Sequence, residues 1–289
     1  MKVLLTGASG FIGSRLTRRL QSAGHIVLPV SRRPDATYNW SNQSLEKGVR
    51  DADAVIHLAG ENLFGRRWSE QQKEKIRSSR TETTSRLAAL IAARKPACFI
   101  SASAVGYYGP SLTTPFHETS PAGNDYLATV CRDWENATAA ASKGDVRTAV
   151  VRTGVVLGKE GGALAKMLPP FRLGLGGPLG DGRQWVSWIH IDDLTALYLH
   201  LLENSQASGP FNGTAPKPVS MKEFAKSLGR ALHRPAIFPV PAPILRLALG
   251  EVADILLTGQ NVEPRRTSES GFRFQFRDID SAIANIVGR

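Results

Sequence analysis

Cysteine and long apolar runs are scarce in this sequence. Only Cys98 and Cys131 occur among 289 residues, without paired spacing or a neighbouring set of His and Cys. We therefore expect two buried thiols, no disulfide framework and no metal site. No segment approaches the roughly 18 uninterrupted apolar residues that a membrane-spanning helix needs. The start, MKVLLTGASGFIG, is broken by glycines and indicates a strand, not a secretory signal. These absences predict a cytoplasmic protein without a membrane partner.

Acidic residues are outnumbered by basic ones. The chain has 25 Asp and Glu against 36 Lys and Arg, which gives a formal net charge of +11. Such a charge suits an anionic ligand, nucleic acid or simple solubility. The arginines are dispersed and no basic run is interleaved with aromatics, so we expect no nucleic-acid partner. A small-molecule substrate fits better, with an anionic compound among the candidates.

The first 30 residues carry the strongest motif. A short apolar strand, KVLLT, is followed by GASGFIG, an amphipathic helix pattern and a second strand, IVLPV. Gly7 permits a tight turn, Gly10 lets the backbone approach a pyrophosphate, and Gly13 allows close packing of helix on strand. The helix N-terminus offers free N–H groups to the phosphates. We therefore predict a dinucleotide site contacted by Gly7, Gly10, Phe11, Ile12 and Gly13.

The end of the second strand discriminates between two cofactors. An NAD site usually places an acidic residue there for the ribose hydroxyl, whereas a 2'-phosphate needs cationic partners. Here the strand ends in SRRPD, and Ser31, Arg32 and Arg33 can donate hydrogen bonds to a phosphate. Asp35 lies beyond Pro34, too far out to accept from the ribose. The pattern favours NADP(H) over NAD, the alternative being solvated surface arginines.

Helix and strand patterns alternate through the first half of the chain, as a doubly wound parallel sheet requires. The fold class predicted is therefore α/β, a Rossmann doubly wound parallel sheet with a smaller C-terminal substrate lobe. We expect strands at 37–40 and 148–158, a strand followed by a glycine loop within 53–62, and a strand running into a small-residue loop within 98–109. We expect helices at 69–93, capped by Ser69, and at about 126–142.

Several separated motifs resemble one superfamily. TGASGFIG, HLAGEN, ISASAVGYYG, VVRTGVVLG and WIHIDDL follow one another as in extended short-chain dehydrogenases/reductases, which are related to nucleotide-sugar epimerases. The run GQNVEPRRTSESGFRFQFRDIDSAI is similar to the atypical group called epimerase family proteins, or NAD-dependent epimerase/dehydratase-like proteins. The resemblance implies a Rossmann domain at 1–158, to which a segment at about 186–215 returns. It implies that 159–289 form mainly the substrate lobe and lid.

The resemblance also implies further cofactor contacts. Small residues after the fourth strand let the backbone approach the adenosine side, and the end of the next strand lies near the nicotinamide ribose. An arginine of the long helix faces the cofactor, with a surface ion pair to Glu74 or Glu82 as the alternative. The implied contacts are Leu58, Ala59, Gly60, Arg80, Ser101, Ala102 and Val156.

Catalysis is where the sequence departs from the family pattern. In active members a serine positions the carbonyl, a tyrosine transfers the proton, and a lysine lowers the pKa of that tyrosine. Ser103 matches the serine, and Tyr126 lies near the tyrosine position. The lysine position falls on Val130 or, one residue later, on Cys131. A tyrosine without the cation keeps a pKa of about 10 and is a poor base at neutral pH.

Three substitutes for the missing pair remain open. Tyr107 or Tyr108 can donate the proton with a charge from Arg132, unless both rings only pack. Glu61 or Glu118 can act as the acid or base, although charged loop residues are more often solvated. Alternatively the protein binds NADPH without turnover. The candidate catalytic residues are Ser103, Tyr126 and Tyr108.

The region after residue 158 supplies the substrate side. LPPFRLGLGGPLGDGRQW is expected to be an ordered loop or lid. Arg172 and Arg183 can meet an anionic substrate or pair with Asp181 or Asp192. His190 is interpreted as structural, before a helix capped by Asp192 and Asp193.

An apolar helix face in the C-terminal lobe leaves the oligomeric state open. Ile244, Leu245, Ala248 and Leu249 have helical spacing, which suits core packing or a dimer contact. The chain is thus expected to be a monomer or homodimer.

Two functions follow. The first is an NADP(H)-dependent oxidoreductase or epimerase-like enzyme acting on an unidentified small carbonyl or hydroxyl compound, with nucleotide sugars among the candidates. The alternative is a non-catalytic NADPH-binding regulatory protein.

Overall fold

A seven-stranded parallel sheet forms the centre of the computed structural model, which describes residues 1–288. The strand order is β11-β7-β5-β4-β1-β2-β3, and every neighbouring pair is parallel. The order reverses between β1 and β4, which is the switch point where open α/β sheets bind ligands. The strands are β1 (Lys2–Thr6), β2 (Ile26–Ser31), β3 (Tyr38–Asn39), β4 (Ala54–His57), β5 (Cys98–Ala104), β7 (Arg147–Thr153) and β11 (Gly209–Gly213).

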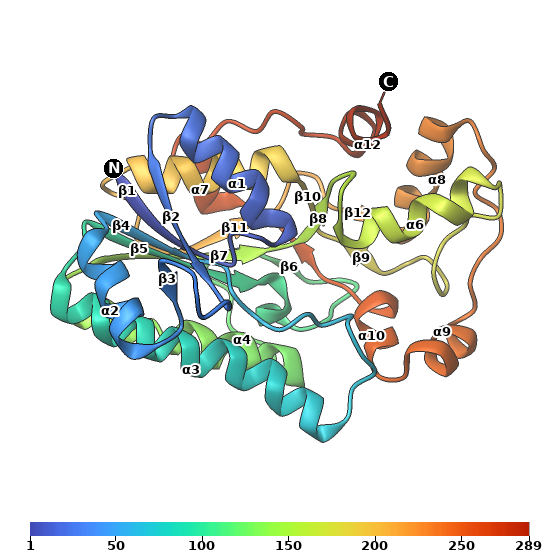
Figure 1. The fold of residues 1–289 in the computed structure, drawn as a ribbon. Coiled ribbons are helices and arrows are strands. Elements are labelled where there is room, and N and C mark those ends of the chain that lie inside the picture. The colour runs from blue at the N-terminus through green and yellow to red at the C-terminus, as the bar shows by residue number, and fades with distance from the viewer. Residues whose placement is uncertain (289) are drawn as a thin grey trace.

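Helices cover both faces of this sheet (Figure 1). One layer holds α1 (Phe11–Ser22) and α7 (Ile191–Glu203). The other holds α2 (Asn42–Asp51), α3 (Glu70–Arg94), α4 (Tyr126–Asn136) and α5 (Ala139–Lys143). This arrangement confirms the predicted Rossmann fold class.

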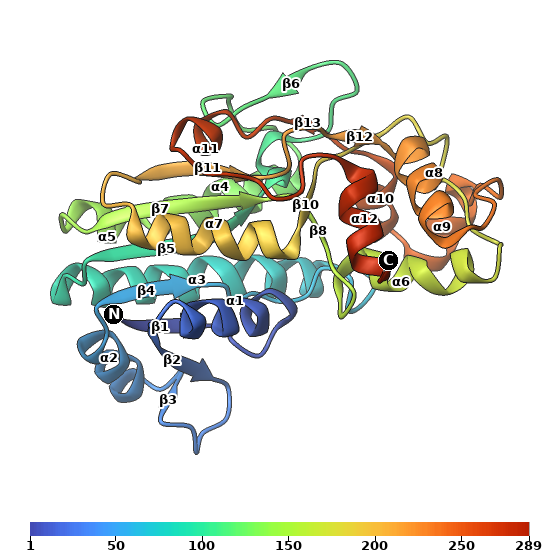
Figure 2. The same cartoon turned by 90° about the horizontal axis from the view of Figure 1, so that it is seen from above.

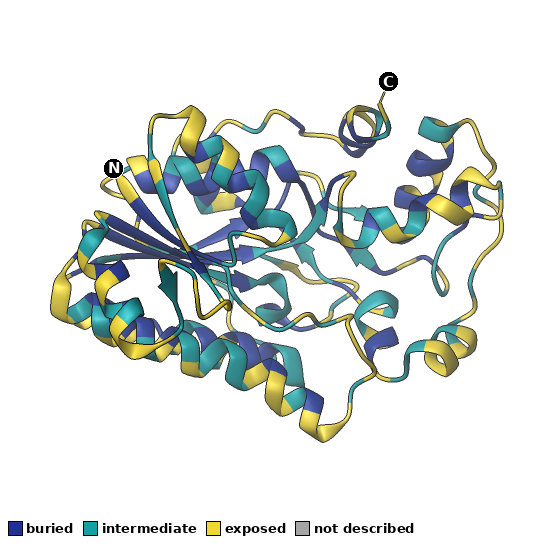
Figure 3. Cartoon of the chain, viewed as in Figure 1, coloured by how far each residue is buried: buried dark blue, intermediate teal, exposed yellow. Residues whose placement is uncertain are grey.

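The alternation of side chains along β1 places its residues in the cores on both faces of the sheet. Val3 and Leu5 pack with α1 and α7, whereas Leu4 packs on the opposite face with α2 and α3, and all three are fully buried. Successive side chains of a strand point to opposite faces, so a continuous apolar run is what a doubly covered strand needs. Figure 3 shows the sheet as the most buried part of the chain.

A smaller lobe lies beyond the carboxyl ends of the parallel strands (Figure 2). Its own core gathers large side chains such as Trp188, Phe171 and Phe224. It contains three two-stranded sheets, made of β8 (Val155–Leu157) with β10 (Trp188–His190), β9 (Trp185–Val186) with β12 (Val219–Ser220), and β6 (Pro115–Phe116) with β13 (Asn261–Val262). Its helices are α6 (Gly162–Arg172), α8 (Met221–Leu232), α9 (Ala242–Leu249), α10 (Val252–Leu257) and α12 (Ile279–Val287). Helix α11 (Arg265–Glu269) lies instead beside β11 of the central sheet (Figure 2).

Some local predictions are confirmed. Ser69 caps α3 by accepting the backbone N–H of Gln72, and both cysteines are free and buried. The position of the domain boundary at residue 158 stays a prediction.

Three local predictions are wrong. The helix expected over 126–142 is two helices, α4 and α5. The strand expected over 148–158 divides at Gly154, where an added Cβ would lie 2.2 Å from the carbonyl oxygen of Ser187. Strand β8 then leaves the central sheet and pairs with β10. The expected loop starting at Leu168 is helical to Arg172 despite two internal prolines, because its apolar side chains are buried.

Candidate dinucleotide and catalytic site

The glycine turn after β1 has the geometry of a backbone cradle. Gly7 has φ +71°, and a Cβ there would lie 3.0 Å from the carbonyl carbon of Leu58. A Cβ on Gly13 would lie 2.1 Å from the oxygen of Gly7, so only glycine lets α1 sit this close to the turn. Gly10 precedes α1, and no side chain caps the helix. The first N–H groups of α1 are therefore directed at the switch point without a side-chain acceptor.

Phe11 and Ile12, which lie between Gly10 and Gly13, face in different directions. Ile12 packs against the core between the sheet and the helices α1 and α7. Phe11 instead contacts the start of the lobe, where a Cβ added to Gly158 or Gly161 would lie 2.7 Å from its ring. Gly162 lies beside the same ring. The segment at 158–162 thus forms a notch, lined by glycines, that holds the Phe11 ring. Sequence reasoning missed this contact.

The loop after β4 is tied to β1 through a hydroxyl group. The hydroxyl of Thr6 accepts the backbone N–H groups of Leu58 and Ala59, at 3.1 and 3.2 Å. Its oxygen lies 2.6 Å from Nδ1 of His57. Burial, with a smaller contribution from the charge of Arg80, lowers the pKa of His57 to about 4. His57 is therefore neutral at physiological pH and helps to fix the loop.

The end of β2 carries the residues expected at a 2'-phosphate. Ser31 ends the strand, and its hydroxyl accepts the N–H of Arg33 at 3.1 Å. Arg33 pairs with Asp35 at 2.8 Å, and both side chains are largely exposed. Arg32 is exposed and makes no ion pair with residues 1–288. Two cationic side chains and a hydroxyl thus stand at the strand end, and Asp35 is engaged by Arg33.

Arg80 does not make the surface ion pair offered as an alternative. Its guanidinium donates to the carbonyl oxygens of Ile76 and Glu61, each at 3.0 Å, and lies over the ring of Trp134. Burial lowers the pKa of Arg80. An added Cβ on Gly60 would lie 3.3 Å from the same guanidinium. The arginine therefore packs directly under the loop that contains Leu58, Ala59 and Gly60.

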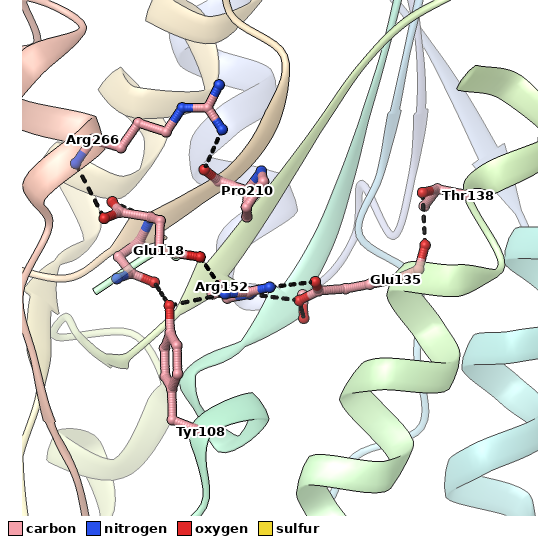
Figure 4. A network of polar contacts seen from close by, with 9 residues as sticks. Tyr108, Glu118, Glu135, Thr138, Arg152, Pro210 and Arg266 are labelled. Atoms are coloured by element: carbon pink, nitrogen blue, oxygen red, sulfur yellow. Dashed lines mark hydrogen bonds and ion pairs between the residues drawn. The ribbon is translucent and has the colours of Figure 1, made fainter. Parts of the chain in front are cut away.

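A buried polar network crosses the carboxyl ends of β5, β7 and β11 (Figure 4). Arg152 of β7 makes two hydrogen bonds of 2.8 Å to the carboxylate of Glu135 on α4. It also donates to the hydroxyl of Tyr108 and to the carbonyl oxygen of Glu118. The ring of Tyr107 lies 3.5 Å from the guanidinium. Burial alone would lower the pKa of Arg152, but Glu135 raises it above its usual value, so Arg152 stays charged.

Glu118 is the second acid of this network. It is 4% exposed, and its carboxylate accepts the backbone N–H groups of Asn212, Arg266 and Thr267. The view that a loop acid is solvated is wrong for Glu118, because its carboxylate accepts one backbone N–H group from β11 and two from α11. Because its carboxylate accepts these three hydrogen bonds, Glu118 has a structural role.

Each candidate catalytic hydroxyl donates to a protein acceptor. Ser103, at the end of β5 and 3% exposed, donates to Glu135 at 2.7 Å. Tyr108 donates to the side-chain oxygen of Asn212, and burial raises the pKa of Tyr108 to about 12. Tyr126 donates to the carbonyl oxygen of Lys73, and burial raises the pKa of Tyr126 too. The structure joins Ser103 and Tyr108 through Glu135 and Arg152, whereas Tyr126 binds elsewhere.

Helix α4 has no lysine at the position that the sequence pattern requires, but the Nζ of Lys73 on α3 lies 5.8 Å from the ring centroid of Tyr126. Val130 and Cys131 are both buried on α4. Burial raises the pKa of the Cys131 thiol to about 12, so it stays protonated and cannot supply a charge. The cation near Tyr108 is Arg152; Arg132 is exposed. A charged residue inside the apolar strand AVVRT was the available signal for a buried ion pair, and sequence reasoning did not use it.

The other implied contacts lie at the strand ends. Ser101 is buried and its hydroxyl donates to the carbonyl oxygen of Ala102. Val156 lies on β8, not in a loop, and packs against the main core. His190 caps α7 through Nδ1, and burial lowers the pKa of His190, which agrees with a structural histidine. The expectation that Asp192 is the N-cap is therefore wrong, because His190 takes that position and both Asp192 and Asp193 lie in the first turn of α7.

The arginines expected on the substrate side do not make the expected acid pairs. Asp192 pairs with Arg15 at 2.6 Å, and Asp181 accepts only the backbone N–H of Arg183. Arg172 and Arg183 are exposed, and neither guanidinium makes an ion pair within residues 1–288. Both charges thus remain open to an anionic ligand.

Comparison with known proteins agrees with this geometry. Residues 3–212 match the sequence pattern of the NAD dependent epimerase/dehydratase family. The chain belongs to this family. A domain of unknown function, DUF1731, matches residues 240–286 within the lobe.

Similar proteins span nearly the whole chain. The mouse epimerase family protein SDR39U1 is 45% identical, covering 99% of this chain and 100% of its own length. A chloroplastic SDR39U1 homologue of Arabidopsis thaliana is 43% identical, covering 99% and 87%. The crystal structure of human SDR39U1 (isoform 2) with NADPH has a TM-score of 0.92 and 40% identity, covering 99% of both chains. Since one relative is chloroplastic, the expected cytoplasmic location stays a prediction.

Neither a membrane-spanning helix nor a metal-binding cluster occurs within residues 1–288. No helix there combines the length and hydropathy needed to cross a bilayer. No group of three or more His, Cys, Asp or Glu side chains there has a metal-binding arrangement.

Proposed function

We propose that this protein binds NADP(H) across the carboxyl ends of β1, β2 and β4. The observation that carries the proposal is the glycine cradle, in which a Cβ on Gly13 would collide with Gly7. Such a cradle brings backbone N–H groups to a pyrophosphate. Ser31, Arg32 and Arg33 add donors for a 2'-phosphate, and the human relative was crystallised with NADPH.

Replacement of Arg32 by Ala tests the 2'-phosphate contact. We expect NADPH affinity to fall by about 2 kcal/mol, which is about thirtyfold, because a charge-assisted hydrogen bond is lost. NADH affinity should not change. Arg132→Ala removes the same charge from an exposed position of α4 and serves as the control. An equal loss of affinity for NADPH and NADH would refute the contact between Arg32 and the 2'-phosphate, but it would not refute dinucleotide binding.

We further propose an oxidoreductase or epimerase-like reaction on a small carbonyl or hydroxyl compound. Bound NADP(H) would supply hydride transfer. Ser103 has its proton directed at Glu135, so its lone pairs are free to accept a hydrogen bond from a substrate hydroxyl. Arg152 keeps Glu135 in place on the far side. The exposed Arg183 favours an anionic substrate, whereas Arg172 ends α6 at the far end of the lobe; nucleotide sugars are the class to test first.

The second candidate is a non-catalytic NADPH-binding regulatory protein. The hydroxyls of Ser103, Tyr108 and Tyr126 all donate to protein acceptors. No lysine stands in the usual position on α4 to lower a tyrosine pKa. A site arranged in this way needs no substrate to satisfy its polar groups.

A turnover screen distinguishes the two candidates. Purified protein is loaded with NADPH and its nicotinamide absorbance is followed with pools of carbonyl metabolites and nucleotide sugars. Product analysis of the sugar pools detects an epimerase that regenerates its cofactor. Turnover that disappears in Ser103→Ala supports the enzyme. Tight NADPH binding without any product supports the regulatory protein.

A further inference from the structure

The outer edge of the C-terminal lobe exposes many large apolar side chains. Ten large hydrophobic residues of the described chain are exposed, and six of them lie on this edge, with exposed fractions from 49% to 79%. Isolated exposed hydrophobic residues are normal, but a group of this kind marks an interaction surface. We call it the lobe edge, and it consists of Leu173, Leu175, Ile237, Phe238, Ile244 and Leu247.

Two segments distant in sequence form the lobe edge together. The N–H of Phe238 donates to the oxygen of Gly176 at 3.1 Å, and the N–H of Val240 donates to Pro178 at 2.9 Å. Helix α9 follows at once, and none of its residues is buried. Figures 1 and 2 both place these segments at the end of the lobe far from the sheet, and Figure 3 shows α9 as mainly exposed.

The two segments that form the lobe edge carry basic residues and no acidic ones. Residues 161–180 and 224–250 contain no Asp or Glu, but they contain six basic residues. Arg230 and Arg246 pair with acids from other segments. The other four make no ion pair within residues 1–288, although Glu223 lies one turn before Lys226 on α8, so basic side chains predominate around the apolar ones. These four are Lys166, Arg172, Lys226 and Arg234.

Proline lowers the polarity of the same surface. Pro235, Pro239, Pro241 and Pro243 fall within nine residues and all are exposed. Each lacks a backbone N–H, so four donors that would lose hydration at a dry interface are absent. The segment can therefore approach an apolar phase with fewer unsatisfied groups than an ordinary loop.

We propose that the lobe edge docks on an anionic lipid surface. Exposed Leu, Ile and Phe side chains insert at the boundary of headgroups and acyl chains, while Lys and Arg bind the anionic headgroups. A second copy of the chain fits less well, because a two-fold contact would bring the same positive charges together. Peripheral docking needs no spanning helix. The proposal therefore revises the expectation of no membrane partner, which rested on the lack of a spanning segment.

Vesicle flotation tests the proposal with the full chain. Vesicles of phosphatidylcholine are compared with equal mixtures of phosphatidylcholine and phosphatidylglycerol, at low and high salt. We expect binding to the mixed vesicles only, weakened by salt. Arg172→Gln with Lys226→Gln should weaken binding about 25-fold, at about fivefold for each charge. Lys47→Gln with Lys143→Gln makes the same charge change at exposed positions elsewhere and should have a much smaller effect.

A second pair of variants tests the apolar contribution at constant charge. Leu173→Ser with Leu247→Ser should weaken binding by about tenfold for each leucine. Ile26→Ser with Leu112→Ser changes two exposed residues outside the lobe edge and should leave binding unchanged. Circular dichroism confirms that each variant is folded.

Three outcomes would overturn the proposal. One is the absence of binding to phosphatidylglycerol vesicles. Another is an equal loss in the control variants, which would show that the net charge of +11 acts without a specific surface. The third is a dimer in sedimentation that the two leucine substitutions dissociate without any effect on vesicles, in which case a second copy covers the lobe edge.

Discussion

Substitution of Glu135 by Gln tests the ion pair that ends β7. The Arg152 side chain is 4% exposed, and two of its hydrogen bonds are made to this carboxylate. Gln has nearly the same shape, but its amide NH2 must face a guanidinium donor, and the buried charge of Arg152 loses its partner. Removal of one member of a buried pair costs about 3–5 kcal/mol. We expect a decrease of that size in the free energy of unfolding.

Urea unfolding at neutral pH measures this decrease, with the slope of the transition checked for constancy. Asp133→Asn is the matched control, because Asp133 lies two residues earlier on α4 and pairs with a half-exposed Arg77. That substitution should cost less than about 1 kcal/mol. Arg152→Met added to Glu135→Gln should cost less than the two single changes together. A Glu135→Gln effect no larger than the Asp133→Asn effect would refute the reasoning.

Two further substitutions test the cradle and its buried histidine. Gly13→Ala should abolish measurable NADPH binding and lower the melting temperature, because its Cβ would lie 2.1 Å from the oxygen of Gly7. Gly10→Ala, where the same distance is 3.3 Å, should leave the melting temperature of the free protein nearly unchanged; equal shifts of the melting temperature would contradict this. Burial holds the pKa of His57 near 4, below its unfolded value of about 6.5. The stability from the neutral imidazole is therefore complete above pH 6.5 and is lost as pH falls toward 4. Between pH 7 and 5 we expect a loss of about 2 kcal/mol that His57→Asn does not show; parallel curves for the two proteins would argue against it.

The fold could be predicted because its signals are local. An apolar strand, a glycine turn and a helix pattern within 30 residues specify a βαβ unit, and the alternation that follows specifies the sheet. Errors fell where contacts between distant segments decide. Gly154 redirects the chain because the oxygen of Ser187 occupies the space of a side chain, and nothing near residue 154 in the sequence indicates this.

The catalytic side was harder for the same reason. Glu135 and Arg152 are 17 residues apart, and their contact to Ser103 depends on the register of α4 against β5 and β7. A motif shows which lysine is missing, but it does not show which side chains lie beside Ser103 and Tyr108 in its place. The structure shows an acid and an arginine there, and whether they serve catalysis stays a prediction.

The Phe11 ring makes two distant parts of the sequence mutually dependent. A Cβ on Gly158 or Gly161 would overlap a ring that belongs to the cofactor turn. A side chain can therefore be gained at either glycine only after the ring at position 11 becomes smaller. Mutations at these sites should show strong epistasis, in which Phe11→Ala rescues Gly161→Ala although each alone is harmful. An evolving member of this family would have to change the dinucleotide turn and the entrance to the lobe as one unit.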